Sequence, residues 1–357
     1  MTRRIETIYI KKGFEDKPEV EALLKSHREV SVKSFAHVSE VAVRGNSMSE
    51  KIEAGKTTLV VASRSGSMVD RFVNDDPGSV CPAFYKLVPS TNCPHDCEYC
   101  FLQSTYRAVR PYVCAYVIDF GELGKTLRRR FGRDSGQVLL NAGEMSDPIA
   151  CDVLGNMPWL VTLFSDMENI RLLLSTKSGL AEIEPLLEAP HAGNTVLAWS
   201  INCPEIISQY EHGTASLDDR LQAAHAAQDA GYEVRFRIDP IIEFSGWEDA
   251  YQRVVAAIYA RGIRVSRITL GSFRMLTPLK HIIAKRFPNS ALLSQTLEKN
   301  GKRLRYEQRV REKFYRCAIE SIRKYDSNIP IALCKESPEM HRVFRELVDR
   351  RTCNCQI

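Results

Sequence analysis

Three closely spaced cysteines, Cys93, Cys97 and Cys100, are the residues of this chain best suited to bind a metal centre. Their spacing is C-x3-C-x2-C, and they follow an apolar run, residues 84–88, that is typical of a β-strand. A loop with three thiolates can ligate three irons of a cubane iron–sulfur cluster and leave the fourth iron open. An open coordination position lets a small molecule bind the metal and react there.

A zinc site is the simpler alternative for these cysteines. Structural zinc is held by four protein ligands. The nearest additional thiols, Cys81 and Cys114, stand at no spacing that is typical of zinc sites. The sequence therefore favours an iron–sulfur cluster over a structural zinc ion.

The pattern C-x3-C-x-aromatic-C, with Tyr99 as the aromatic residue, resembles the signature of the radical S-adenosylmethionine (SAM) enzymes. The resemblance implies a [4Fe-4S] cluster whose open iron binds the amino and carboxylate groups of SAM, with Tyr99 beside the adenine. It also implies reductive cleavage of SAM to methionine and a 5′-deoxyadenosyl radical, with electrons from a low-potential donor such as flavodoxin or ferredoxin. In such enzymes the cofactor supplies the difficult chemistry, and the protein positions the reactants.

The composition is that of an ordinary globular chain with a mildly basic character. Of 357 residues, 44% are hydrophobic and 26% are charged, and the formal net charge is +5. This charge permits a nucleic-acid partner without requiring one. Eleven cysteines, an odd number, in a chain without a recognisable signal sequence favour a reducing, cytoplasmic location over a disulfide framework. Because no apolar run reaches the roughly 20 residues of a membrane span, no membrane partner is expected.

Strand-like and helix-like segments alternate from residue 84 onward. The predicted strands are 84–88, 137–141, 170–175, 195–201, 234–239 and 265–270, and the predicted helices are 123–131, 158–167, 180–187, 217–229 and 247–261. This alternation indicates a parallel sheet with right-handed crossovers. A doubly wound sheet would alternate in the same way. The cysteine motif favours an α/β fold with a partial (β/α)6 TIM-type barrel of the radical SAM kind.

Three regions are expected along the chain. Residues 1–83 form a small N-terminal α/β region, residues 84–285 form the barrel, and residues 286–357 form a basic, helical C-terminal extension. Within them we expect strands at 7–10 and 57–62, a helix at 17–29, a loop over 44–56, an additional strand at 113–118 and a helix at 307–324.

Polar residues end five successive predicted strands, at the rim where barrel enzymes place their active sites. Around these ends the chain resembles the spore photoproduct lyase family, radical SAM enzymes that repair a thymine dimer in DNA. The similarity is carried by Ser200-Ile-Asn202, by residues 210–224 (YEHGTASLDDRLQAA), and by residues 230–232, 239–242 and 246–247. It implies SAM contacts at Ser146, Lys177, Ser200 and Asn202, and activity in nucleic-acid repair or modification.

Two positions depart from the pattern of that family. Glu144 aligns with a cysteine that gives a hydrogen atom to the product radical, and Phe101 replaces a tyrosine of its hydrogen relay. A carboxylic O–H and a phenyl C–H are stronger bonds than a thiol S–H, so neither side chain substitutes as a donor. Gly143-Glu144 instead resembles the turn of other radical SAM enzymes whose Glu accepts a charge-assisted hydrogen bond from the SAM amino group. A solvated loop glutamate is the alternative.

Two further thiols, Cys353 and Cys355, lie in the last residues of the sequence. We expect this tail to be mobile. The two thiols serve as hydrogen donors only if the tail folds back over the barrel mouth. Otherwise they are a redox pair, ligands of a second metal, or inert.

A basic segment of the C-terminal extension contains Lys302, Arg303 and Arg305, followed by Tyr306. Cations attract phosphates regardless of sequence, and an aromatic ring can stack on an exposed base. The same stretch resembles a hairpin that the family presses against its DNA lesion, although a solvated surface is the simpler reading. Two other functions stay open: a radical SAM enzyme acting on a protein or small metabolite, and a non-catalytic metal-containing nucleic-acid-binding protein.

Overall fold

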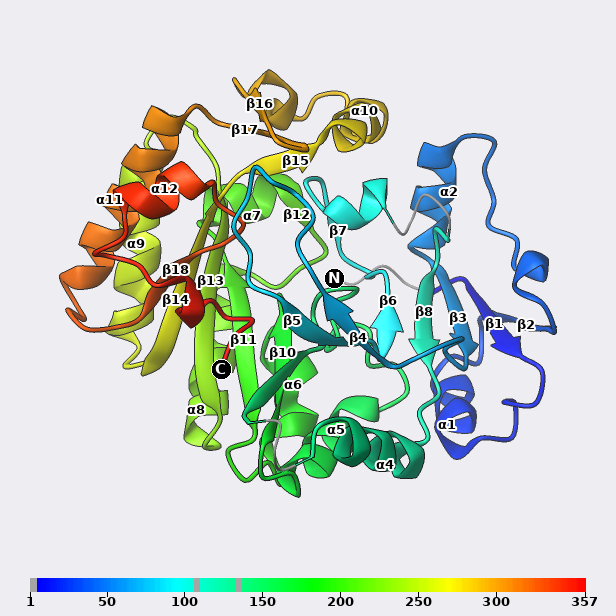
Figure 1. Cartoon of the computed structure of the whole chain (residues 1–357). Helices are drawn as coiled ribbons and strands as arrows, with labels where there is room; N and C mark the ends of the chain where they lie inside the picture. The colour runs from blue at the N-terminus through cyan, green and yellow to red at the C-terminus, as the bar shows by residue number, and fades with distance from the viewer. Residues whose placement is uncertain (1–4, 106–109, 133–135) are drawn as a thin grey trace.

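A computed structural model of the chain describes residues 5–105, 110–132 and 136–357. Its larger sheet has eight strands in the order β18-β14-β13-β11-β10-β9-β5-β4, and a five-stranded sheet lies beside it (Figure 1). Six strands of the larger sheet are those predicted from the sequence: β5 (Phe84–Leu87), β9 (Val138–Asn141), β10 (Ile170–Thr176), β11 (Thr195–Ile201), β13 (Glu233–Ile241) and β14 (Val265–Ser272).

These six strands are parallel, and the prediction of a partial parallel barrel is confirmed. Two further strands of this sheet were not predicted. β18 (Ile331–Leu333) lies parallel to β14, and β4 (Val69–Phe72) lies antiparallel to β5. The opening between the two edges is bridged by a single pair, Val80 with Glu336.

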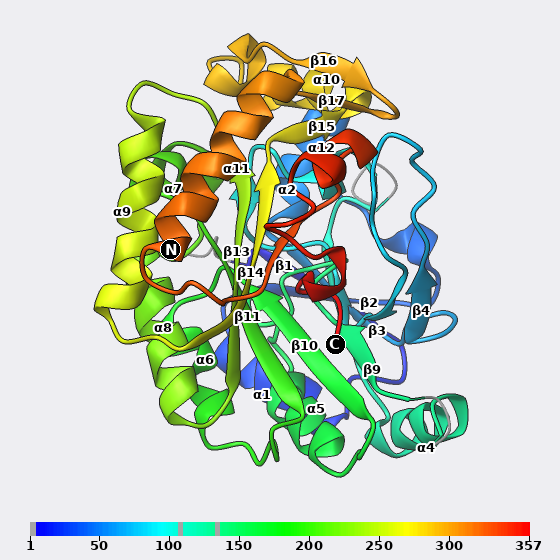
Figure 2. The same cartoon turned by 60° about the vertical axis from the view of Figure 1, so that its left-hand side comes forward.

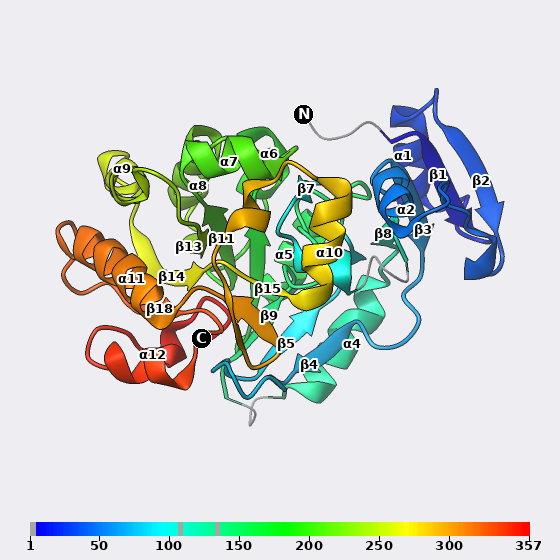
Figure 3. The same ribbon diagram turned by 90° about the horizontal axis from the view of Figure 1, so that it is seen from above.

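Helices cover the outer face of the barrel, as the view from above shows (Figure 3). They are α4 (Phe120–Arg130), α5 (Asn156–Ser165), α6 (Leu180–Leu187), α8 (Leu217–Asp229), α9 (Trp247–Ala260) and α11 (Gln308–Arg323). Side chains alternate between the two faces of each strand. In β10, Leu172 and Leu174 belong to the core beneath the helices, whereas Leu173 packs with Leu139 and Val196 on the inner face.

The smaller sheet holds the N-terminal region together. Its strands are β2 (Ser31–Phe35), β1 (Thr7–Lys11), β3 (Thr58–Ala62), β8 (Val113–Tyr116) and β6 (Ser90–Thr91), accompanied by α1 (Pro18–Ser26) and α2 (Met48–Gly55). The predicted additional strand is β8, which joins this sheet by pairing with β3. The predicted loop over 44–56 is wrong, because Ser47 caps α2 by accepting a hydrogen bond from the Glu50 amide.

The C-terminal region covers the mouth of the barrel (Figure 3). A three-stranded antiparallel sheet is built from β15 (Arg274–Leu276), β17 (Arg303–Arg305) and β16 (Glu298–Asn300), next to α10 (Thr277–Arg286). The predicted hairpin is thus present as β16–β17, and the predicted helix at 307–324 is α11. The remaining short elements are η1 (Val38–Glu40), β7 (Asp96–Cys97), η2 (Phe101–Ser104), α7 (Pro204–Tyr210), β12 (Glu211–His212), η4 (Ala291–Ser294), α12 (Pro338–Val343) and η5 (Arg350–Thr352).

The C-terminal tail is packed against the inner face of the barrel strands, and the prediction of a mobile tail is wrong (Figure 2). Asn354 donates to the Phe236 carbonyl at 3.1 Å and accepts from the Thr269 hydroxyl at 2.9 Å. Arg235 donates to the carbonyls of Asn354 and Gln356 at 2.9 and 2.8 Å. Polar side chains on the inner face of a barrel need partners, and the tail supplies them.

No helix among the described residues combines the length and the apolar character needed to cross a membrane.

Candidate functional site

The three cysteines of the C-x3-C-x2-C motif lie on one loop after the first barrel strand, β5. Cys93 and Cys97 are 8% and 7% exposed, and Cys100 is half-buried. None of the chain's eleven cysteines, all within the described ranges, forms a disulfide. The hydrogen bond from Cys151 and the charge of His95 overcome the effect of burial and lower the pKa of Cys93 to about 5. A low pKa favours the thiolate form that ligates metals.

Side chains from outside the loop hold its backbone in place. Lys56 donates to the Cys93 carbonyl at 3.1 Å and pairs with Asp96 at 3.3 Å. Gln103 donates to the Cys97 carbonyl at 3.2 Å, and Arg286 pairs with Asp96 at 2.8 Å. These contacts fix the loop without involving the sulfur atoms.

The loop is compatible with an iron–sulfur cluster. Within the described part of the chain, no three His, Cys, Asp or Glu side chains converge as ligands of one ion. This geometry gives no support to the zinc alternative. In a cubane cluster each thiolate binds a different iron, so the three sulfur atoms need not meet at one point.

A buried network links the cysteine loop to the ends of two barrel strands, β10 and β11. The Glu211 carboxylate accepts from the Tyr99 hydroxyl, from Lys177 at 3.0 Å and from Arg220 at 2.6 Å. Lys177 also lies 5.7 Å above the Tyr99 ring. Arg220 reaches further and donates to the Ser200 carbonyl at 2.9 Å. The structure therefore brings together three of the predicted SAM contacts, Tyr99, Lys177 and Ser200.

Glu211 and Arg220, at the centre of this network, were not predicted as site residues. Both side chains are fully shielded from solvent. Burial alone would raise the pKa of Glu211, but the charges of Arg220 and Lys177 and the Tyr99 hydrogen bond lower it to about 2. The carboxylate is therefore ionised, as a buried carboxylate with two cationic partners should be. Both residues lie in residues 210–224, the stretch that resembles the family. That resemblance was the only feature of the sequence that could have pointed to them.

Gly143 and Glu144 follow β9 at the barrel mouth. A Cβ atom on Gly143 would lie 2.5 Å from the Ser175 Cβ, so only glycine allows this approach of the loop to β10. Glu144 lies 3.5 Å from Nζ of Lys335, a residue that the sequence did not single out. Lys335 also lies 5.8 Å above the ring of Phe101. Lys335 thus lies next to both Glu144 and Phe101, the two positions expected to depart from the family pattern.

The other two predicted SAM contacts are already hydrogen-bonded within the protein. The Ser146 hydroxyl lies 2.7 Å from the Ser90 hydroxyl. Asn202 is fully buried; its amide donates to the Pro240 carbonyl at 2.8 Å, and its oxygen accepts from the Cys203 amide at 3.0 Å. In this structure both side chains support the strand ends.

The four residues predicted to contact nucleic acid divide into two pairs. Lys302 is exposed and pairs with Asp75 at 2.6 Å, whereas Arg303 is half-buried and pairs with Asp76 at 3.2 Å. Tyr306 is 1% exposed, and its hydroxyl donates to Gln295 at 2.6 Å. Arg305 is fully buried and pairs with Glu336 at 3.4 Å. The expectation that Arg305 and Tyr306 touch a nucleic acid is wrong for this conformation, because both side chains face the interior.

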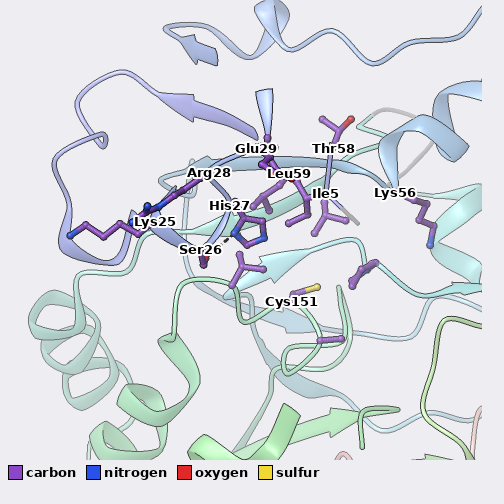
Figure 4. A pocket seen from close by; sticks show the side chains of 15 residues that line it. Ile5, Lys25, Ser26, His27, Arg28, Glu29, Lys56, Thr58, Leu59 and Cys151 are labelled. Atoms are coloured by element: carbon purple, nitrogen blue, oxygen red, sulfur yellow. Dashed lines mark hydrogen bonds between the residues drawn. The ribbon is translucent and has the colours of Figure 1, made fainter. Parts of the chain in front are cut away.

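A cavity of about 560 Å³ lies between the N-terminal sheet and the cysteine loop (Figure 4). His27 and Lys56 line it from the N-terminal region, and Pro94 and Cys151 line it near the cysteine loop. None of the predicted SAM contacts lines this cavity. It is therefore separate from the barrel mouth.

A partial parallel barrel with a three-cysteine loop after its first strand defines a radical SAM enzyme. The chain belongs to the spore photoproduct lyase family, whose model matches residues 5–326. It is 29% identical over 252 residues to spore photoproduct lyase of Clostridium acetobutylicum, covering 70% of this chain and 72% of that protein. It is 28% identical over 255 residues to the Bacillus subtilis lyase, with coverage of 70% and 72%.

Solved structures of spore photoproduct lyase share the fold. The enzyme complexed with dinucleoside spore photoproduct matches with a TM-score of 0.79 and 22% identity, over 93% of this chain and 99% of that chain. A variant with bound AdoMet and dinucleoside spore photoproduct matches with a TM-score of 0.79 and 21% identity over the same shares.

Proposed function

We propose that this protein cleaves SAM reductively at a [4Fe-4S] cluster held by Cys93, Cys97 and Cys100. The resulting radical removes a hydrogen atom from a nucleic-acid substrate, in repair or modification. The observation that carries the proposal is the three-thiol loop of a spore photoproduct lyase family member, joined through Tyr99 to a buried ionic network at the strand ends.

Each part of the site has a role in this proposal. When bound, the cluster supplies the electron that cleaves SAM to methionine and a 5′-deoxyadenosyl radical. Tyr99 would lie beside the adenine, and Lys177 would add a positive charge that its ion pair with Glu211 holds in place. Gly143 gives the β9 loop its close approach to β10, and Glu144 would accept a hydrogen bond from the SAM amino group. Ser200 would complete the SAM contacts, and Ser146 and Asn202 would join it only on giving up their present hydrogen bonds.

The substrate class follows from the relatives. The solved lyase binds a dinucleoside spore photoproduct. In this chain, Lys302 and Arg303 on the β16–β17 hairpin pair with Asp75 and Asp76. In the proposed complex they would exchange these carboxylates for phosphates, which Lys and Arg attract. The electron comes from a low-potential donor such as flavodoxin or ferredoxin.

The test uses the anaerobically reconstituted protein with SAM and the dinucleoside spore photoproduct deuterated at its abstractable positions. We expect deuterium in the deoxyadenosine product, measured by mass spectrometry. SAM cleavage without label transfer would favour a protein or small-metabolite substrate. Oligonucleotide binding without any SAM cleavage would favour a non-catalytic nucleic-acid-binding protein.

A further inference from the structure

Two thiols of the C-terminal tail lie inside the barrel. Cys353 and Cys355 are 6% and 8% exposed and pack against Phe84 and Ala332. Phe84 and Ala332 point inward, because their strand neighbours Tyr85 and Ile331 belong to the core beneath the helices. The two thiols lie in one turn of the tail, and Asn354 between them bonds β13 and β14.

Polar groups of the barrel wall hold the Cys355 sulfur. Arg237 donates to it at 3.3 Å, and the amide of Asn141 donates at 3.4 Å. The other end of the Asn141 side chain accepts from the Gly143 amide at 2.8 Å. One asparagine thus connects the Cys355 thiol to the loop that carries Glu144. This contact places the thiol directly beneath the barrel mouth.

The two tail thiols influence each other's protonation. The interaction with Cys353, together with burial, raises the pKa of Cys355 well above its ordinary value. The interaction with Cys355 lowers the pKa of Cys353, although burial alone would raise it. Cys355 therefore keeps its proton at neutral pH.

We propose that the Cys353–Cys355 pair is the hydrogen-atom donor that ends the substrate radical, with Cys355 as the donating thiol. The proposal rests on the proposed function, which generates that radical. It gives this chain a donor although neither Glu144 nor Phe101 can serve. A thiol is suited to the task because its S–H bond is weaker than the C–H bond that forms.

The step is balanced in atoms and electrons. The S–H bond of Cys355 breaks homolytically, and its hydrogen atom forms a C–H bond at the carbon that held the unpaired electron. The unpaired electron then resides on the Cys355 sulfur. No proton or electron leaves the site in this step.

The experiment uses the reconstituted full-length enzyme with SAM and unlabelled dinucleoside spore photoproduct in deuterated water. Thiol hydrogens exchange with solvent, whereas carbon-bound hydrogens do not. The wild-type product should therefore carry solvent deuterium on carbon. Cys355→Ser keeps a group that bonds Asn141 and Arg237 but replaces S–H by a stronger O–H. It should lower the yield of product with carbon-bound deuterium at least about tenfold. Cys317→Ser, on the outer helix α11, is the matched control and should behave as the wild type.

A parallel measurement separates this proposal from the proposed function. With deuterated substrate in ordinary water, Cys355→Ser should still transfer deuterium to deoxyadenosine at the wild-type rate in the first turnover. Equal carbon-bound solvent deuterium in wild type, Cys355→Ser and the double variant with Cys353→Ser would overturn the donor proposal alone. Absence of label transfer in the wild type would overturn both proposals together.

A readout without turnover tests the contact between the two sulfurs. Trypsin cleaves after Arg351 and releases residues 352–357, which hold both tail thiols and no other cysteine. After mild oxidation of the native protein with diamide, this peptide should be lighter by two hydrogens, as for an internal disulfide.

Discussion

The carboxylate of Glu144 lies 3.5 Å from Nζ of Lys335 at the mouth of the barrel. Both side chains are largely shielded from solvent, at 15% and 16% exposed. Burial alone would lower the pKa of Lys335, but the charge of Glu144 raises it. Glu144, the residue expected at the family's hydrogen-donor position, is therefore held by a cation from the C-terminal region. A SAM amino group would share this carboxylate with Lys335.

Replacement of Glu144 by Gln should weaken SAM binding. The variant loses a charge-assisted hydrogen bond, which is worth about 1.5–3 kcal/mol, or roughly a tenfold to hundredfold rise in Kd. Anaerobic equilibrium dialysis of the reconstituted protein with labelled SAM measures the change. Glu346→Gln, at an exposed side chain, is the control. If the variant binds SAM as tightly as the wild type but is less stable to heat, Glu144 serves only to pair with Lys335 and does not bind SAM.

Replacement of Cys97 by Ala should abolish SAM cleavage and leave the protein with less bound iron. The wild type should hold about four irons per chain, the content of one cubane. Iron analysis and chromatography of deoxyadenosine after anaerobic reconstitution measure both. Cys317→Ala, remote from the loop, should match the wild type. A protein that carries zinc and no iron, or a Cys97→Ala variant that still cleaves SAM, would refute the cluster assignment.

The barrel was predictable because its signal is local. Apolar strand segments alternate with amphipathic helices from residue 84 onward, and that periodicity was sufficient for six strands. β18 was missed because three residues, Ile331–Leu333, are too short a run to stand out. Tyr99 and Lys177 were predicted from a motif and from strand ends. Their partner Glu211 lies in a stretch that resembles the family, but no role was predicted for it, because burial cannot be read from one sequence.

The errors concern residues whose burial depends on distant partners. In the sequence, Arg305 and Tyr306 look like surface residues of a basic run. In the structure both are buried, because Arg305 pairs with Glu336 and Tyr306 donates a hydrogen bond to Gln295. The tail was expected to be mobile because it is short, polar and terminal. Its partners, Thr269 and Arg235, are polar residues in the middle of predicted strands. Only the folded barrel brings them to the tail.

Replacement of Lys302 and Arg303 by Gln should weaken oligonucleotide binding. Each lost phosphate contact should lower the slope of log K against log salt by roughly one. Fluorescence anisotropy at several salt concentrations measures the slope. Lys324→Gln, at the far end of α11, is the matched control. Tyr306→Phe should leave binding unchanged, because this ring is buried. A large loss of affinity in Tyr306→Phe, or none in the Lys302 and Arg303 variants, would move the interface elsewhere.

Glu233 should make the anchoring of the tail sensitive to acid. Its carboxylate lies 2.7 Å from both Arg171 and Arg235, and Arg235 holds the tail carbonyls. Burial alone would raise the pKa of Glu233, but Arg235 and its other partners lower it from 4.5 to about 2. A depressed carboxyl pKa stabilises the fold at every pH above the ordinary value. That stabilisation is lost as the pH falls from about 4.5 toward 2.

Glu233→Gln should therefore lower the free energy of unfolding by roughly 2–3 kcal/mol near neutral pH. The difference from the wild type should shrink below a pH of about 4.5, because the wild-type carboxylate is then itself becoming protonated. Urea unfolding followed by circular dichroism at several pH values measures this. The control Glu205→Gln removes an exposed pair with Arg253 and should cost less than about 1 kcal/mol at any pH.

Glu233→Gln should also expose Cys353 and Cys355 to faster alkylation, because Arg235 loses the carboxylate that orients it toward the tail. A stability difference that stays constant down to low pH would show that Glu233 acts through packing and not through its charge.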